Sequence, residues 1–423
     1  MTKADAVQGL NDASLGAPAG TIESVIDAIV AMALPIHGAE TIEIGAALGR
    51  VLAADVCSPS QLPVFDNSAV DGFGIGRLAL DTAPCRLSLA GRVAAGRSAP
   101  SPPLGDGEAV RLLTGAPIPP GVRAVVAEEH CERSTAAIVL RRPVREGLNI
   151  RRAGEDIRVG AVAVAAGQRI DARHVALLAG IGCREVSVRS RVRVGILSSG
   201  SELVDAGAEL PPGKIRNVNG PMLRALLSQS WLEVCDFGIC PDDPEALTRS
   251  IGAAAGRTDV LLATGGVFGS DTDCLAMAVA GLGGTVVHCQ VAMKPGKRLL
   301  IGRVGRMLVL ALPGNPTAAL VSFLLFGRPL LARTAGLVAI FQPECTAITA
   351  ERLPHAAGRT EFTFVRVCGR AGDGSPLVEP MGRGSSHVSR LAEADGLAQL
   401  PASEGDIPVG SRVAVLLFRP SLL

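Results

Sequence analysis

Apolar and polar positions alternate along residues 191–335 in a repeated order of strand, loop and helix. Short apolar runs at 192–197, 232–237 and 259–263 are each followed by a polar or glycine-rich segment. Helical spacing of apolar residues appears at 223–227, 244–255, 273–281 and after Pro316, and strand-like runs lie at 284–288, 298–301 and 307–311. This alternation predicts an open, mostly parallel α/β sheet with helices on both faces.

The rest of the chain has a different pattern. Residues 21–34 show helical spacing, with Thr21 as a cap and Pro35 as a stop. Residues 58–149 are rich in glycine, proline and short β-type runs, and beyond about Pro343 helical patterns disappear. We therefore expect a mixed α/β domain (21–57 plus 150–187), an inserted β-rich domain (58–149), the α/β sheet domain (188–335) and a C-terminal β-barrel domain (343–423).

Charge and cysteine content narrow the class of partner. The 423 residues include 41 basic and 40 acidic side chains, a formal net charge of +1. Such balance argues against a nucleic-acid or membrane-surface binder. The ten cysteines include no CxxC pair, which favours a cytoplasmic protein without a disulfide framework. The first twenty residues lack the apolar segment of a signal peptide, and the longest apolar stretch, 316–331, is too short to cross a bilayer.

Three glycine-containing loops follow apolar runs in the α/β region. They are SSGSEL from Ser198, TGGVFGSDTD from Thr264 and LPGNP from Leu312. An open α/β sheet places such loops together at the carboxyl ends of its strands, where backbone amides can hold an anion. The spacing of neither a P-loop nor a dinucleotide fingerprint is present. The candidate anion-binding residues are Ser199, Gly200, Gly265, Gly266, Pro313, Gly314 and Asn315.

Acidic and basic side chains accompany these loops. Glu202, Asp271 and Asp273 suit Mg²⁺, which favours one or two carboxylates plus substrate phosphates. Asp242 and Asp243 precede Pro244 and are first explained as helix caps. In VAMKPGK, the two lysines at 294 and 297 flank a Pro-Gly turn, either as solvated surface groups or as ligands of one pyrophosphate.

Three polar motifs in the first 160 residues allow two interpretations each. PVFDNSAVDGF, which contains Asp66, is either a capping turn or a ligand loop. Thr114 in RLLTGAPIPPG either faces a ligand or belongs to a hairpin that needs Gly115. NIRRAGEDI, which contains Asp156, is either a solvated salt-bridged turn or a phosphate-binding arginine fork.

Taken in order, these motifs resemble those of the MoeA family, the molybdopterin molybdenumtransferases related to the C-terminal region of gephyrin. FDNSAVDGF is similar to the family's FDNSAMDGY, TGAPIPPG to TGAPVPEG, and SSGSEL to STGDEL. GEDI, PGK and LPGNP also match, as do GRTEF at Gly358 and GSSHVSRLAEADGL at Gly384. The resemblance covers nearly the whole chain and implies a MoaB/Mog-like α/β domain within a multidomain homodimer.

The activity implied by the resemblance is Mg²⁺-dependent insertion of molybdenum from molybdate into adenylyl-molybdopterin, with release of AMP. The implied partners are a MogA-like adenylyltransferase and a recipient molybdoenzyme. The residues that match the family's functional acids are Asp66, Asp156, Glu202, Asp242 and Asp273, of which Glu202, Asp242 and Asp273 would hold the metal. The residues that match its substrate-binding positions include Thr114, Lys294, Arg359 and Ser385, beside the loop residues and Lys297 named above.

The chain departs from the family pattern at two positions of the expected site. Phe268 stands where the family's GGVSVG loop has serine, and Gln290 stands where relatives often have a lysine. The first change removes a hydroxyl that could bind an anion, and the second removes a positive charge. The second loss matters more, because charge-assisted hydrogen bonds are roughly twice as strong as neutral ones. The alternative hypothesis is a non-catalytic protein that binds or delivers molybdopterin or the finished cofactor, or acts as a scaffold.

Overall fold

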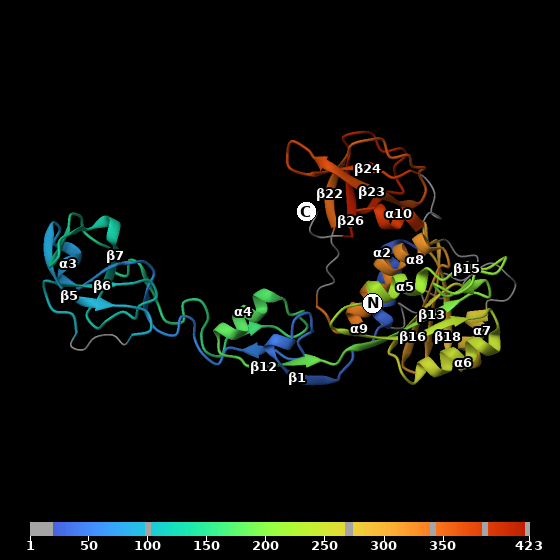
Figure 1. Cartoon of the computed structure of the whole chain (residues 1–423), viewed down its shortest axis with the longest axis horizontal. Helices are drawn as coiled ribbons and strands as arrows, with labels where there is room; N and C mark the ends of the chain where they lie inside the picture. The colour runs from blue at the N-terminus through green and yellow to red at the C-terminus, as the bar shows by residue number, and fades with distance from the viewer. Residues whose placement is uncertain (1–19, 98–102, 267–273, 339–343, 383–387, 419–423) are drawn as a thin grey trace.

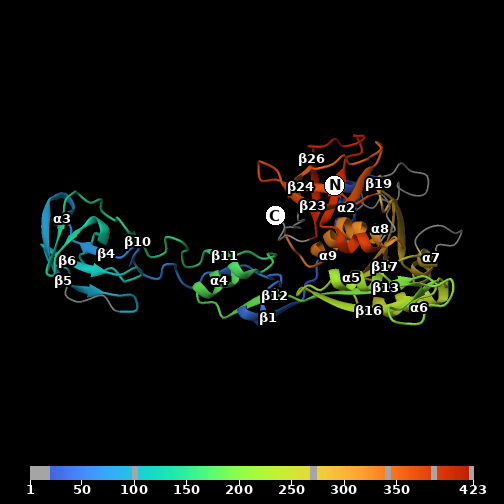
Figure 2. The same ribbon diagram turned by 45° about the horizontal axis from the view of Figure 1, so that its top comes forward.

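The computed structural model describes the chain except for residues 1–19, 98–102, 267–273, 339–343, 383–387 and 419–423. Figures 1 and 2 show an elongated molecule, with a β-rich domain at one end and an α/β domain topped by a small β domain at the other. A middle domain around helix α4 joins the two ends. This arrangement confirms the expected multidomain α/β and β fold.

The α/β domain is built on a six-stranded sheet in the order β16-β13-β17-β21-β20-β18. Neighbouring strands from β16 to β21 are parallel, whereas β20 is antiparallel to both of its neighbours. The strands are β13 (Val192–Ser199), β16 (Leu232–Cys240), β17 (Val260–Thr264), β18 (Thr285–Gln290), β20 (Arg298–Val304) and β21 (Met307–Leu312). The predicted, mostly parallel sheet is therefore confirmed.

Helices cover both faces of this sheet because its central strands carry apolar residues on both sides. Along β13, Val194 and Ile196 belong to one core, whereas Leu197 belongs to the other. The helices α6 (Pro244–Ala255) and α7 (Cys274–Gly281) pack on the Leu197 side. On the opposite face lie α5 (Asn219–Leu226), α8 (Pro316–Ser322), a π-helical turn η3 (Phe323–Gly327) and α9 (Arg328–Thr334).

The first helix, α2 (Ile22–Met32), also packs on this second face. Thr21 caps it, as expected, by accepting a hydrogen bond from the Ser24 amide. Its buried residues Val25 and Ile29 share a core with Phe326 on η3, far away in the sequence. The sequence grouped residues 21–57 with the mixed α/β domain. In the structure, the apolar face of α2 is instead buried by the α/β sheet domain.

The middle domain combines two antiparallel strand pairs with one helix. Strand β1 (Ala39–Glu43) pairs with β12 (Glu185–Arg189), and β2 (Val56–Cys57) pairs with β11 (Val162–Val164). Helix α4 (Ala172–Gly180) is fixed by a capping box between Asp171 and His174. A 3₁₀ turn, η1 (Ile44–Ala46), completes this part. Both chain segments that enter the domain thus contribute strands to it.

The inserted domain is a six-stranded sheet in the order β7-β4-β6-β5-β9-β8, as expected from its β-type runs. Phe73 on β4 is fully buried in its core. The elements are β4 (Gly72–Ile75), α3 (Leu78–Asp81), β5 (Cys85–Val93), β6 (Glu108–Leu112), β7 (Ala124–Ala127), η2 (Glu128–His130), β8 (Glu132–Arg133) and β9 (Ala137–Leu140). The short pair β3 (Asn67–Ser68) and β10 (Ile150–Arg151) connects it to the middle domain.

The C-terminal domain is the expected closed barrel. Pairing runs β23-β24-β22-β26-β25 and returns from β25 to β23. The strands are β22 (Glu344–Thr349), β23 (Thr360–Arg370), β24 (Pro376–Pro380), β25 (Gly396–Leu400) and β26 (Arg412–Leu417). The expectation that helices disappear after residue 343 is wrong for α10 (Val388–Glu393), a short helix with no fully buried residue and hence little apolar periodicity.

A short strand from the α/β domain, β19 (Met293–Lys294), joins the barrel by pairing with β23. The predicted core helix around residues 316–331 is confirmed, since α8 and η3 are almost entirely buried. Within the described ranges, no helix is long and apolar enough to cross a membrane.

Candidate functional site

The loops at the carboxyl ends of the parallel strands meet around Ser199. Ser199 ends β13, and its hydroxyl donates a 2.5 Å hydrogen bond to Oδ1 of Asp242, which follows β16. The second oxygen of Asp242 accepts a 3.3 Å bond from the Ser201 amide, and the Ser201 hydroxyl accepts a 3.0 Å bond from the Asp242 amide. Two predicted site residues, Ser199 and Asp242, are thus joined directly.

Asp242 and Asp243 make different hydrogen bonds, although the sequence first explained both as helix caps. Asp243 is the cap of α6, because its carboxylate accepts a 2.7 Å bond from the Ala246 amide. Asp242 makes no such bond and faces Ser199 and Ser201 instead. The capping interpretation is therefore correct for Asp243 and wrong for Asp242.

Glu202 lies over the turn that follows Ser199. A Cβ placed on Gly200 would come within 2.9 Å of both carboxylate oxygens of Glu202. The Asp242 carboxylate borders the same turn through the Ser201 amide. Two predicted acids therefore stand beside one short segment of backbone at Gly200.

Two glycines after β17 allow the second loop to approach β13 closely. Gly265 and Gly266 have φ values of +83° and +65°, which side chains disfavour. A Cβ on Gly265 would lie 2.0 Å from the Ser199 carbonyl oxygen, and one on Gly266 would lie 3.1 Å from the Ser199 hydroxyl oxygen. The glycines thus bring backbone, rather than side chains, against the Ser199–Asp242 pair.

The third loop, after β21, completes this edge of the sheet. Gly314 lies beside Gly265, since a Cβ on Gly314 would be 3.6 Å from the Gly265 Cα. The side-chain amide of Asn219 donates a 2.8 Å bond to the Gly314 carbonyl, and Asn315 caps α8. We call the edge formed by Ser199, Asp242, Gly265, Gly266 and Gly314 the rim; Pro313 precedes Gly314 in the same loop.

The donor set of the rim fits a Mg²⁺ ion held together with a phosphorylated ligand. Mg²⁺ is usually bound through one or two carboxylates, with phosphates and water as the other ligands. Glu202 and Asp242 supply two carboxylates at one turn. No group of three or more metal-binding side chains occurs among the described residues. Asp273, the third predicted metal ligand, lies outside those residues, as do Asp271, Phe268 and Ser385.

The predicted anion-binding residue Lys294 forms an ion pair with a residue of the barrel. Its ammonium group donates a 2.9 Å hydrogen bond to Oε1 of Glu361, across the junction between β19 and β23. The other oxygen of Glu361 lies 3.3 Å from Nδ1 of His355, whose Nε2 is 3.0 Å from the Pro401 carbonyl. Neither Glu361 nor His355 was a candidate from sequence, because their role depends on contact between two domains.

Electrostatics at this junction stabilise the ionised carboxylate. Burial alone would raise the pKa of Glu361, but hydrogen bonds from Lys294 and His355 lower the pKa below its ordinary value of 4.5. Lys297 is exposed, and no ion pair to it occurs among the described residues. Arg359, also exposed, directly precedes the β23 residue that pairs with Met293. Of the two lysines, Lys297 is therefore the one without an ion pair among the described residues.

The N-terminal motifs form a second cluster at the β3–β10 pair. Asp66 accepts a 2.6 Å bond from Arg152 and a 2.8 Å bond from the Ala153 amide. The Ala153 bond, together with Arg152, lowers the pKa of Asp66 below its ordinary 3.8, against the effect of burial. Asp156 is exposed on the same loop. The salt bridge expected within NIRRAGEDI does not occur among the described ion pairs: the Arg152 side chain pairs with Asp66, and the Arg152 amide donates to Glu155.

Thr114 lies on the neighbouring turn. Its amide and its hydroxyl donate bonds of 2.7 and 2.8 Å to the same oxygen of Asp71. Gly115 has a φ of +78°, which favours glycine, but the hairpin interpretation is wrong, because β6 and β7 each pair with β4 and not with each other. These two bonds lower the pKa of Asp71, the amide bond most. The turn is thus held by the acid of the FDNSAVDGF motif.

The two clusters lie far apart within one chain. Figures 1 and 2 place the inserted domain and the β3–β10 pair on the opposite side of the middle domain from the α/β domain. The structure therefore unites Ser199, Glu202, Asp242 and the glycine loops in one site, and Asp66, Thr114 and Asp156 in another.

Comparison with known proteins links both clusters to one family. Residues 21–182 match the model of the MoeA N-terminal region (domain I and II), residues 195–333 that of a probable molybdopterin binding domain, and residues 346–418 that of the MoeA C-terminal region (domain IV). The chain is 33% identical over 386 residues to molybdopterin molybdenumtransferase 2 of Mycobacterium tuberculosis, covering 89% of this chain and 94% of the relative.

Further relatives support the same assignment. Molybdopterin molybdenumtransferase of Haemophilus influenzae is 32% identical, over 90% of this chain and 94% of its own length. Two solved structures of a molybdopterin biosynthesis MoeA protein from Pyrococcus horikoshii cover 95% of this chain and 100% of theirs, with TM-scores of 0.74 and 0.78 at 32% and 27% identity. The chain thus belongs to the MoeA family, whose curated relatives are named molybdopterin molybdenumtransferases.

Proposed function

We propose that this protein is a molybdopterin molybdenumtransferase of molybdenum cofactor biosynthesis. In the proposed reaction, it transfers molybdenum from molybdate into adenylyl-molybdopterin and releases AMP. The observation that carries the proposal is the rim, where Ser199, Asp242 and three glycine-rich loops meet at the carboxyl ends of parallel strands. This is where open α/β sheets bind their ligands, and the family names molybdopterin as the ligand.

The residues of the rim suit an adenylate substrate with a pyrophosphate bond. Backbone around Gly265, Gly266 and Gly314 presents small, close-fitting loops to an anion. Asp242, oriented by Ser199 and Ser201, and Glu202 would hold Mg²⁺, which neutralises charge on the phosphates when bound. Lys297 supplies an exposed cation near the third loop's helix, since its neighbour Gly296 packs against Ser322 of α8.

The proposal includes a homodimer with a shared site. One chain keeps Asp66, Thr114 and Asp156 on the far side of the middle domain from the rim (Figure 1). A second copy arranged head to tail can bring these residues to the rim of its partner, and two-fold dimers are the commonest protein oligomers. Mixing an Asp66→Asn variant with an Asp242→Asn variant tests this arrangement. Restored turnover in the mixture supports a shared site, and two inactive proteins that stay inactive after subunit exchange contradict it.

The alternative is a protein that binds or delivers molybdopterin or the finished cofactor without catalysis. Two observations favour it: Gln290 at the end of β18 replaces an expected lysine, and Lys294 is already paired with Glu361. Both reduce the positive charge available to an oxyanion. The enzyme remains the better-supported function, because Ser199, Glu202 and Asp242 are retained and assembled.

Purified protein incubated with adenylyl-molybdopterin, molybdate and Mg²⁺ separates the two functions. The enzyme proposal predicts AMP release that requires molybdate. Retention of the pterin without AMP release would support the binding protein instead. A Gln290→Lys variant adds a second comparison, because a faster reaction would show that the missing cation limits the natural chain.

The remaining parts of the proposal concern the cellular setting. We place the protein in the cytoplasm, where its ten cysteines, all free thiols in the structure, would stay reduced. A MogA-like adenylyltransferase would supply the adenylylated pterin, and a molybdoenzyme would receive the product. Pull-down with a MogA-like protein tests the first of these contacts.

A further inference from the structure

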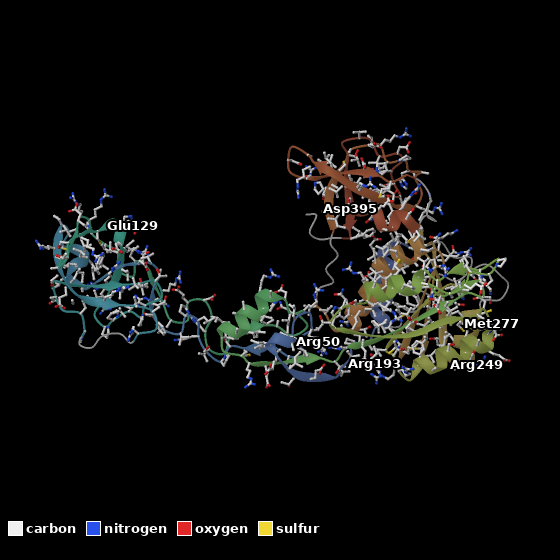
Figure 3. The ribbon with its side chains drawn as sticks, in the orientation of Figure 1. Arg50, Glu129, Arg193, Arg249, Met277 and Asp395 are labelled. Atoms are coloured by element: carbon white, nitrogen blue, oxygen red, sulfur yellow. The ribbon has the colours of Figure 1, made fainter. Side chains whose placement is uncertain are left out.

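A second, charged cleft lies where the middle domain joins the α/β domain. It has a volume of about 760 Å³ and is lined by residues from both domains. Figure 3 shows Arg50 and Arg193 on either side of this junction. We call it the hinge cleft; its lining is Ile36, His37, Gly38, Glu40, Arg50, Ser190, Arg191, Arg193, Glu233, Asp259 and Arg306.

The hinge cleft is at the opposite edge of the sheet from the rim. Arg193 lies near the start of β13, and Asp259 directly precedes β17. Arg306 occupies the turn between β20 and β21. The parallel strands thus present their amino ends to the cleft and their carboxyl ends to the rim, so one small ligand cannot occupy both.

Two of the three acids that line the cleft are paired with its own arginines, and the third is Glu233. Asp259 accepts bonds of 2.8 Å from both the guanidinium and the amide of Arg193. Glu40 accepts a 2.5 Å bond from Arg50, and that bond lowers the pKa of Glu40 below its ordinary 4.5. Two basic side chains, Arg191 and Arg306, are exposed and have no ion pair with any described residue. With four arginines and three acids in its lining, the cleft carries a formal charge of +1.

Arg50 adds an independent indication. It is only 4% exposed, and its Nη2 makes both of its hydrogen bonds, to Glu40 and to the Arg189 carbonyl at 2.9 Å. Its Nε is buried and finds no acceptor in the described part of the chain. Buried polar groups are normally satisfied, and guanidinium groups fit phosphate oxygens well. The guanidinium of a lining arginine favours an anionic ligand over a cation.

We propose that the hinge cleft binds a small phosphate-bearing anion with at least two negative charges. Arg191 and Arg306 hold its oxygens from the two sides of the junction, with Arg50 beneath them. The volume lies within the range of small-molecule sites, roughly 300 to 1,000 Å³, and such sites occur preferentially between domains. Because Arg191 lies in the link from β12 to β13, the ligand also stiffens the connection between the middle and α/β domains.

The chain contains a natural reporter for this cleft. Trp231 is the only tryptophan, and there is no tyrosine. Its carbonyl accepts a 3.1 Å bond from the Val192 amide, and Glu233, two residues later, lines the cleft. Tryptophan emission therefore reports on the amino-end edge of the sheet rather than on the rim.

Titration of the full chain with sodium pyrophosphate, followed by Trp231 emission and by calorimetry, tests the proposal. Wild type is expected to bind saturably and more weakly as salt rises. An Arg191→Ser, Arg306→Ser double variant should bind roughly tenfold more weakly or worse, because each loses a charged hydrogen bond. Arg249→Ser, at an exposed residue of α6 that lies away from Arg193 in Figure 3, should bind like wild type. Lys297→Ala, at the rim, should keep the Trp231 emission response, because that response reports on the hinge cleft.

Inorganic phosphate and a nucleoside diphosphate, titrated in parallel, distinguish a free pyrophosphate-like anion from a nucleotide. If neither heat nor a change in emission is seen up to about 1 mM pyrophosphate, the proposal is overturned. A dissociation constant of that size corresponds to a binding free energy of about −4 kcal/mol. Binding by the double variant within twofold of wild type also overturns it. A response lost in Lys297→Ala instead would assign the binding to the rim and refute the hinge cleft.

Discussion

Replacing Gly265 by alanine perturbs the rim at its most crowded point. The new Cβ would lie 2.0 Å from the Ser199 carbonyl oxygen, whereas ordinary contact begins at 3.4 Å. The loop and β13 must therefore separate by about 1.4 Å, which is 3.4 minus 2.0. The neighbouring atom is backbone in a central strand, so rotation of a side chain cannot relieve the contact. Separation would also move Gly266 away from the Ser199–Asp242 pair.

The expected cost has two parts. Alanine at the φ of +83° observed for Gly265 costs about 1 to 2 kcal/mol. Overpacking in a well-packed region typically costs about 1 to 3 kcal/mol more. The sum, ~2 to 5 kcal/mol, is large compared with the usual stability of a domain, about 5 to 15 kcal/mol. If the loop moves and so relieves part of this strain, the loss of stability will be smaller. The displaced loop should then lower turnover instead.

Urea unfolding followed by Trp231 emission measures the first effect, since Trp231 packs against the core of the α/β domain. AMP release measures the second. The matched control is Gly256→Ala, where φ is −82° and no atom lies within 4 Å of the new Cβ. The control should be neutral or stabilising by up to about 1 kcal/mol. If Gly265→Ala unfolds at the same urea concentration as the control and keeps full turnover, the close approach of these loops is not what builds the site.

Three further changes test separate parts of the account. Asp242→Asn should lower AMP release at least about 100-fold by removing a proposed metal ligand, whereas Asp243→Asn, still a good helix cap, should leave release within about twofold. Glu361 has a lowered pKa and therefore stabilises the fold above about pH 4.5 and loses this effect as pH falls; thermal unfolding should show a smaller loss on acidification in Glu361→Gln. Arg152→Met should raise the pKa of Asp66, followed by NMR, and cost less than about 1 kcal/mol because the pair is exposed. Unchanged titration of Asp66 would show that Arg152 does not influence it.

Local pattern was sufficient to predict the α/β domain and the rim. Apolar runs followed by glycine loops recur there, and parallel topology alone brings their carboxyl ends together. Spacing therefore placed Ser199 and the loops after β17 and β21 at one edge of the sheet, as the structure has them. The closed barrel was likewise predicted from short alternating runs.

Interactions between distant segments were not predictable in this way. The apolar face of α2 shows only that the helix is buried, not that its partner is η3, some 300 residues later. The sequence around Lys294 is typical of a solvated or anion-binding lysine. Only the β19–β23 pairing shows that Glu361 is its partner. Asp242 and Asp243 are equally good helix caps by sequence. Only the position of Ser199 at the end of its strand shows that Asp242 binds Ser199 while Asp243 caps the helix.

The most direct test of the central claim is the transfer of molybdenum itself. Wild type and Asp242→Asn would each be incubated with adenylyl-molybdopterin, Mg²⁺ and molybdate, and the pterin product analysed by mass spectrometry for molybdenum. We predict that wild type yields the molybdenum-bearing pterin with an equal amount of AMP and that Asp242→Asn yields neither. Wild type that retains the pterin but adds no molybdenum, or equal product from both proteins, would contradict the account.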